Sequence, residues 1–233
     1  MAKKPTLTSR DQEILSHIHR FRISTPEVLH RLFFPGAAPN AVTKVLSRLR
    51  RAGLLSQHDL YQTRKYWMLT PQAASRFGEL PSSTKPLGPQ ALTDRFGVLA
   101  FCCRGEELRH KITATEFRER FPELYSPRFR TASYFVEQRG SQSSLGVVHV
   151  DHGADHLRVL RKALRQTQER IEIPAFRKVI NDGRFSIAIV TAYDEKKLKL
   201  EHALEEREPL AARYHVETVP ELAHLVGVPH VRA

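Results

Sequence analysis

The sequence predicts an α+β protein in two parts: a helical part that ends in a hairpin, and a part in which strands and helices alternate. Up to residue 51, apolar residues recur at helical spacing, and short runs at strand spacing dominate later. Residues 79–90 contain three prolines, a glycine and small polar residues without periodicity, which is typical of a linker. The expected division is therefore 5–78, a linker at 79–90, and 91–233.

The first expected helix begins after Thr8 or Ser9, because either hydroxyl can cap it. Asp11 and Glu13 place negative charge in its first turn, where the helix dipole favours it. Its apolar residues share one face, namely Ile14, Leu15, Ile18 and Phe21.

The second expected helix follows Ser24 or Thr25 and has Pro26 at its first position, which proline favours. Its apolar stripe consists of Val28, Leu29, Leu32 and Phe33. Pro35-Gly36 ends the helix.

The third expected helix runs from about Pro39-Asn40 to Arg51 and ends at Gly53. One face is apolar, with Val42, Val45, Leu46 and Leu49. The opposite face carries Asn40, Ala41, Thr43, Lys44, Ser47, Arg48 and Arg51. Short polar side chains followed by cations suit a helix in the major groove of DNA, although a plain amphipathic surface helix has the same pattern.

Two strands are expected at 54–57 and 63–69 around a polar turn at 58–62, followed by a short helix at 72–77. Three helices and a two-stranded wing form the order of a winged helix-turn-helix, in which the third helix contacts bases and wing cations contact phosphates. The sequence therefore predicts double-stranded DNA as the partner. The expected contacts are Asn40, Thr43, Lys44, Ser47, Arg48, Arg51, Arg64 and Lys65.

The net charge of +12 is unevenly distributed. Residues 1–78 hold 13 Lys and Arg against 4 Asp and Glu, a net of +9, whereas residues 79–233 hold 24 against 21, a net of +3. This distribution is expected if only the first third contacts a polyanion. It also argues against a third hypothesis, an adaptor whose winged helix binds protein.

Three stretches resemble the replication-relaxation family of plasmids and other mobile elements: residues 7–15, the Leu-x-x-Leu-x-x-x-Gly-Leu-Leu pattern within 41–55, and 66–70. Members of that family resemble a winged helix joined to an α/β region. The resemblance implies a transcriptional regulator or replication accessory factor. A homodimer is expected because such regulators usually bind inverted repeats. The apolar helix at 91–103 is either its interface or buried within its own domain.

The second part should form an α/β sandwich around a mixed sheet. The order resembles a restriction-endonuclease core. The expected helices lie at 91–103, 113–121, 154–170, 196–206 and 220–226, and the strands at 133–137, 145–150, 187–190 and 214–217, with a Gly/Ser turn between the first two.

Such a nuclease needs converging carboxylates to hold Mg²⁺. Glu137 and Asp151, near the ends of successive strands, are candidate catalytic residues, and His149 is a candidate metal ligand where a matching motif has a carboxylate. Alternatively, Asp151 caps the next helix and His149 packs in the sheet. His152 and His156 are a weaker zinc candidate. We expect a degenerate core, used for dimerisation or ligand sensing, with a metal-dependent nuclease or nickase as the alternative.

Other chemistries lack their motifs, including dinucleotide and phosphate-binding loops, so no cofactor is expected. The adjacent Cys102 and Cys103 stand in an apolar run, which indicates buried thiols rather than a disulfide or a nucleophile. No apolar stretch approaches the roughly 20 residues that span a bilayer, so we expect a cytoplasmic protein without a membrane partner.

Overall fold

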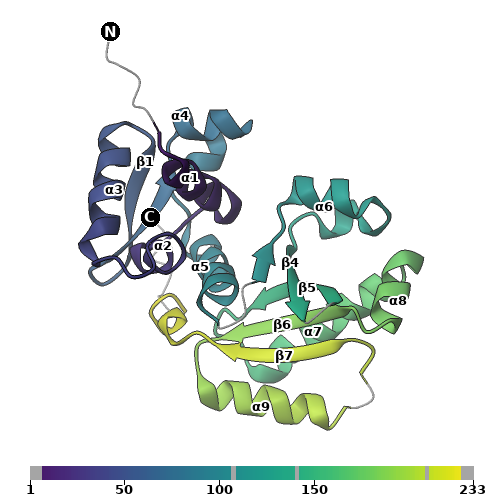
Figure 1. The fold of residues 1–233 in the computed structure, drawn as a ribbon. Coiled ribbons are helices and arrows are strands. Elements are labelled where there is room, and N and C mark those ends of the chain that lie inside the picture. The colour runs from purple at the N-terminus through teal and green to yellow at the C-terminus, as the bar shows by residue number, and fades with distance from the viewer. Residues whose placement is uncertain (1–6, 106–108, 140–141, 208–209, 227–233) are drawn as a thin grey trace. The chain divides into compact units, whose positions relative to one another are not determined.

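A computed structural model (Figure 1) describes residues 7–105, 109–139, 142–207 and 210–226. The chain divides into two compact units, residues 1–99 and 100–233. Both contain helices and strands, so the α+β class predicted from the sequence is confirmed.

The first unit begins with three helices, α1 (Ser9–Phe21), α2 (Pro26–Phe33) and α3 (Asn40–Arg51), whose bounds agree with the sequence prediction. Thr8 caps α1 and Thr25 caps α2, each through its hydroxyl. Gly53 follows α3 with a φ of 71°, and its amide donates to the carbonyl of Arg50 at 2.9 Å. Glycine tolerates this left-handed conformation, which ends the helix.

The hairpin consists of antiparallel strands β1 (Leu55–Tyr61) and β2 (Arg64–Leu69). The predicted turn at 58–62 is wrong, because β1 continues to Tyr61 and pairs it with Arg64. The continuation is anchored by Leu60, which is buried, and by Tyr61, whose ring packs edge-on against Phe96. The polar residues at 56–59 therefore lie in strand β1 rather than in a loop.

The hairpin packs onto the helices to form one core. Backbone atoms of Ser24, between α1 and α2, exchange two hydrogen bonds with Trp67 of β2, at 3.0 and 2.8 Å. After β2, Thr70 caps α4 (Pro71–Ala74), which continues into the short helix η1 (Ser75–Phe77). The buried residues of this core include Ile14, Leu15, Ile18, Leu29, Val42, Leu46, Leu49, Leu54, Leu55, Trp67 and Leu69.

The segment expected as a linker is partly structured and lies in the first unit. It contains η2 (Pro81–Thr84), and the guanidinium of Arg22 donates to the carbonyl of Ser83. The next helix, α5 (Pro89–Arg104), crosses the boundary between the two units.

The second unit contains a five-stranded sheet in the order β3-β4-β5-β6-β7. The pairs β3–β4 and β4–β5 are antiparallel, and β5–β6 and β6–β7 are parallel, so the sheet is mixed as predicted. The strands are β3 (Arg109–Lys111), β4 (Ser133–Arg139), β5 (Gln142–Val150), β6 (Phe185–Thr191) and β7 (Arg213–Thr218). Residues 140–141 of the expected Gly/Ser turn lie outside the described residues.

Four helices of this unit are α6 (Ala114–Arg120), α7 (His156–Ile171), α8 (Pro174–Asn181) and α9 (Asp194–Glu205). Short 3-10 helices lie at Pro122–Leu124, Pro127–Phe129 and Pro220–His224, and the last replaces the helix expected at 220–226. The sequence reading missed β3, whose three residues are all polar or basic, and α8, which follows α7 after a two-residue break.

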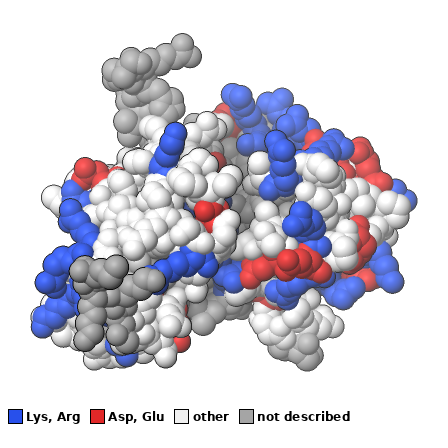
Figure 2. Space-filling model, turned by 90° about the horizontal axis from the view of Figure 1, so that it is seen from above, with Lys and Arg blue, Asp and Glu red and all other residues white. Residues whose placement is uncertain are grey.

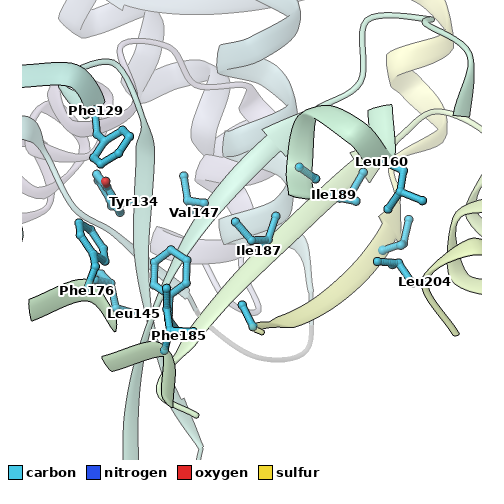
Figure 3. Packing of buried hydrophobic residues seen from close by; sticks show 14 of the residues in the cluster. Phe129, Tyr134, Leu145, Val147, Leu160, Phe176, Phe185, Ile187, Ile189 and Leu204 are labelled. Carbon is cyan, nitrogen blue, oxygen red and sulfur yellow. The ribbon is translucent and has the colours of Figure 1, made fainter. Parts of the chain in front are cut away.

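The main core of the second unit lies between the sheet and α7, α8 and α9 (Figure 3). Successive strand residues alternate between the two faces of a sheet, so every second residue of β5 and β6 points toward these helices. Residues of this core include Leu145, Val147, Leu160, Phe176, Phe185, Ile187, Ile189 and Leu204.

The C-terminal turn of α5 is buried in the second unit. Phe101 packs edge-on against Phe135 at 5.0 Å and stacks on His215 at 5.6 Å between ring centroids. This supports the second alternative for helix 91–103, burial within its own domain rather than a dimer interface. Cys102 and Cys103 are buried and form no disulfide in the described structure, as predicted, and burial raises the pKa of the Cys102 thiol.

Within the described ranges, no helix combines the length and apolar character needed to cross a membrane.

Candidate functional site

The outward face of α3 carries most of the residues predicted to contact DNA. Asn40, Thr43, Lys44, Ser47 and Arg51 are all exposed. The opposite face is fixed by the buried side chains of Val42, Leu46 and Leu49. Because α3 packs through this stripe, its polar and basic residues must face solvent.

Arg48 differs from these residues because it forms an ion pair with Asp11 of α1. Its Nη2 donates to Oδ1 of Asp11 at 2.5 Å, and the Asp11 side chain is only 1% exposed. Asp11 also accepts from the Thr8 amide at 2.9 Å, so it joins the cap of α1 to the middle of α3. Burial raises the pKa of Asp11, but the hydrogen bonds from Arg48 and Thr8 outweigh this and hold the pKa below its ordinary value of 3.8. Arg48 is therefore held by Asp11, and a contact between Arg48 and DNA stays a prediction.

The two cations of the hairpin also have acidic partners. Arg64 forms an ion pair with Glu27 of α2, and Lys65 forms one with Asp59 of β1. All four side chains are at least 40% exposed. Exposed pairs of this kind contribute little stability, so a phosphate group can replace either carboxylate.

Lys44 and Arg51 differ from these residues, because neither forms an ion pair in the described parts of the chain. Arg50, which the sequence reading did not select, is also exposed on α3, and its Nη1 donates to Oε1 of Gln57 at 2.9 Å. Figure 2 shows Lys and Arg side chains gathered on the side of the first unit that carries α3, with few acidic ones among them. The α3 face is thus positively charged and not neutralised internally.

Glu137 and Asp151, the candidate catalytic carboxylates of the second unit, do not converge. Glu137 lies opposite Ser144 in the β4–β5 pair, whereas Asp151 directly follows β5. Asp151 lies seven positions after Ser144, which corresponds to about 23 Å along a strand that rises about 3.3 Å per residue. One metal ion cannot bridge that distance, so the positions of these two residues do not support the alternative in which they share a nuclease site.

Glu137 belongs to a buried ion-pair network that the sequence reading missed along with β3. Arg109 Nε donates to Glu137 at 3.0 Å, and Arg109 Nη1 donates to Glu217 at 2.8 Å and to the carbonyl of Phe101 at 2.9 Å. Its guanidinium lies 4.1 Å from the centre of the Phe101 ring. Burial lowers the pKa of Arg109, but the two carboxylates outweigh this and raise it. One guanidinium therefore fixes both carboxylates and the end of α5.

Asp151 is also engaged within the fold. Its Oδ2 accepts from Thr191 Oγ1 at 3.2 Å and from Lys196 Nζ at 2.5 Å, and its Oδ1 accepts from the amides of Gly153 and Ala154 at 3.0 and 3.2 Å. The expectation that Asp151 caps the following helix is wrong, because Asp155 caps α7. The carboxylate instead fixes the loop before the helix.

The histidine candidates do not come together as a metal site. His149 is buried within β5, as one alternative expected, and His152 lies in the loop before α7. His156 is the first residue of α7 and lies 3.3 Å from Asp155. Among the residues that the structure describes, no three His, Cys, Asp or Glu side chains are placed to hold a metal ion.

Nothing matches this chain among family models, curated proteins or solved structures. The function proposed below therefore depends on the side chains described above.

Proposed function

We propose that the first unit is a winged helix-turn-helix domain that binds double-stranded DNA sequence-specifically, with α3 in the major groove and the β1–β2 hairpin as the wing. The observation that carries this proposal is the exposed face of α3. It presents short polar side chains and unpaired cations, and α3 contains no acidic residue.

The side chains of this face suit the edges of base pairs. Asn40 offers the paired donor and acceptor that recognise adenine, and the hydroxyls of Thr43 and Ser47 can donate or accept. Lys44 and Arg51 provide cations for phosphates or guanine. Phosphate contacts supply affinity that falls with salt, and base contacts supply the sequence preference.

The proposal includes a role as a transcriptional regulator or replication accessory factor of a mobile element, acting as a homodimer on an inverted repeat. Two-fold symmetry in the protein would match two-fold symmetry in the site. A nuclease role is not part of the proposal, because Glu137 of β4 lies opposite Ser144, near the start of β5, whereas Asp151 follows the end of β5.

The test begins with selection of bound sequences from a random pool of duplex DNA, using the full chain. Affinity for the selected duplex is then measured by fluorescence anisotropy over a range of salt concentrations. Lys44→Ala and Arg51→Ala should each weaken binding several-fold and reduce the slope of log affinity against log salt by about 0.9. Lys85→Ala is the matched control, because Lys85 is exposed but lies outside the proposed interface.

An unchanged affinity in both α3 variants would show that α3 is not the contact surface. A selection that enriches no sequence, with salt-dependent binding retained, would reduce the function to non-specific DNA binding.

A further inference from the structure

Helix α7 of the second unit carries a face of exposed cations that the proposed function does not use. This α7 basic face consists of Arg158, Arg161, Lys162 and Arg165. Spacings of three and four residues place the four side chains on one side of the helix, over about 10 Å of its length. The other side is fixed in the core of the unit by the buried Val159, Leu160 and Ala163. The basic face must therefore point toward solvent.

The α7 basic face is not neutralised from within the chain. Residues 156–168 contain no acid. Asp155, just before them, caps the helix, and Glu169, just after them, is shared between Arg128 and Arg165 at 3.2 and 3.7 Å. The other three cations of the face form no ion pair in the part of the chain that the structure describes.

This arrangement opposes the stability of the helix itself. Arg158 and Arg165 each lie three or four residues from both Arg161 and Lys162, and like charges at these spacings repel. Arg158 also lies in the first turn, where the helix dipole disfavours positive charge. Helix α9 of the same unit differs, because two of its lysines pair with glutamates four residues away. An anionic partner outside the chain accounts for a face that folding alone disfavours.

The chemistry of the α7 basic face fits the phosphates of duplex DNA. Three of its four cations are arginines, whose planar guanidinium group can form two parallel hydrogen bonds with a phosphate. Duplex DNA carries one negative charge per about 1.7 Å of its axis, so a face about 10 Å long can meet several phosphates. A membrane surface fits less well, because a helix that binds lipid inserts its apolar side, and the apolar side of α7 is buried in the core.

We propose that the second unit binds the phosphate backbone of duplex DNA through the α7 basic face, without sequence preference. Contacts to phosphates add affinity but carry no information about the bases. The net charge of +3 for residues 79–233 conceals this local concentration of cations, so the expectation that only the first third contacts a polyanion is too narrow. The proposal does not require α3 to bind DNA, because every residue it uses lies in the second unit.

The test measures the affinity of the full chain for a duplex of random sequence by fluorescence anisotropy over a range of salt concentrations. Arg158→Gln/Lys162→Gln should reduce the slope of log affinity against log salt by about 1.8, which is about 0.9 for each of two lost phosphate contacts. The affinity for a selected duplex should fall by the same factor, because the lost contacts do not distinguish sequences. The melting temperature should equal or exceed that of the unmodified chain, because repulsion between like charges is relieved.

Arg118→Gln/Arg120→Gln is the matched control, because it removes the same amount of charge from exposed positions on α6 of the same unit. Its slope should equal that of the unmodified chain. An unchanged slope in the α7 variant would overturn the proposal, and so would an equal reduction in the control. Tighter binding of the full chain to vesicles of acidic phospholipid than to duplex DNA would overturn it as well.

The α3 variants Lys44→Ala and Arg51→Ala separate this proposal from the proposed function. If they leave the affinity unchanged while the α7 variant lowers the slope, the assignment of α3 fails and the α7 basic face remains a DNA contact. The reverse result removes the α7 basic face from the interface and leaves α3 in it.

Discussion

Replacing Arg48 by alanine should destabilise the first unit rather than simply remove a DNA contact. The substitution leaves the Asp11 carboxylate, 1% exposed, without its cationic partner. Removing one member of a fully buried ion pair costs about 3–5 kcal/mol. Arg48 is 42% exposed, so water can replace part of what it provides. We therefore expect a loss of about 1–3 kcal/mol in the free energy of unfolding.

The single tryptophan makes this loss measurable in the first unit alone. Trp67 is buried in β2, so its fluorescence during urea unfolding reports on this unit and not on the second. Arg48→Lys should recover part of the stability, because it restores the charge but not the planar guanidinium. Lys44→Ala, on the exposed face of the same helix, should change stability by less than about 0.5 kcal/mol.

The effect of Arg48→Ala should also depend on pH. The pKa of Asp11 is lowered in the folded chain, so its stabilising contribution is present above the unfolded-state pKa and is lost as pH falls through the folded value. The difference between the variant and the unmodified chain should therefore shrink below about pH 4. If Arg48→Ala is as stable as the unmodified chain at neutral pH but no longer binds DNA, Arg48 is a direct contact and its assignment to Asp11 fails.

Two further substitutions test other parts of the structure. Glu27→Gln should free Arg64 for phosphate contact and tighten DNA binding about two- to threefold at low salt. Glu13→Gln, which changes an exposed acid on α1, is the control. If the Glu27→Gln variant binds DNA no more tightly than the unmodified chain, Glu27 does not compete with DNA for Arg64. Gly146→Ala should destabilise the second unit by about 1–3 kcal/mol, because a Cβ there would lie 2.3 Å from the Phe135 ring. Gly88→Ala is the control, because a Cβ at Gly88 would have no atom within 4 Å. Thermal unfolding is followed by circular dichroism. If Gly146→Ala melts at the same temperature as the unmodified chain, the close packing of Gly146 against Phe135 is contradicted.

The helices of the first unit were predictable because their signals are local. Caps at Thr8 and Thr25, a proline at the first position of α2 and Gly53 after α3 each act within one turn. The apolar spacing of α3 likewise fixes which face is buried. These features require no knowledge of distant residues, so the sequence alone indicates them.

The interactions that the sequence did not reveal are those between residues far apart along the chain. Asp11 and Arg48 are 37 residues apart, and Glu137 is 28 residues from Arg109. Periodicity assigns Arg48 to a polar face but does not show that the far end of its side chain reaches a buried carboxylate. Strand β3 was missed for a related reason, because three polar residues become a strand only when β4 is there to pair with them.

Because the sequence does not show which cations have acidic partners, net charge alone does not give the charge available to DNA. The first 78 residues have a net charge of +9, yet three of the eight predicted contacts, Arg48, Arg64 and Lys65, are already paired with acids. Moving Arg48 away from Asp11 would leave a buried carboxylate without its cation, which is costly. Arg64 and Lys65 pair with exposed carboxylates, which a DNA phosphate can replace at little cost. The charge available to DNA is therefore set by how deeply each acidic partner is buried. For that reason the exposed face of α3, rather than the excess of basic residues, carries the proposed function.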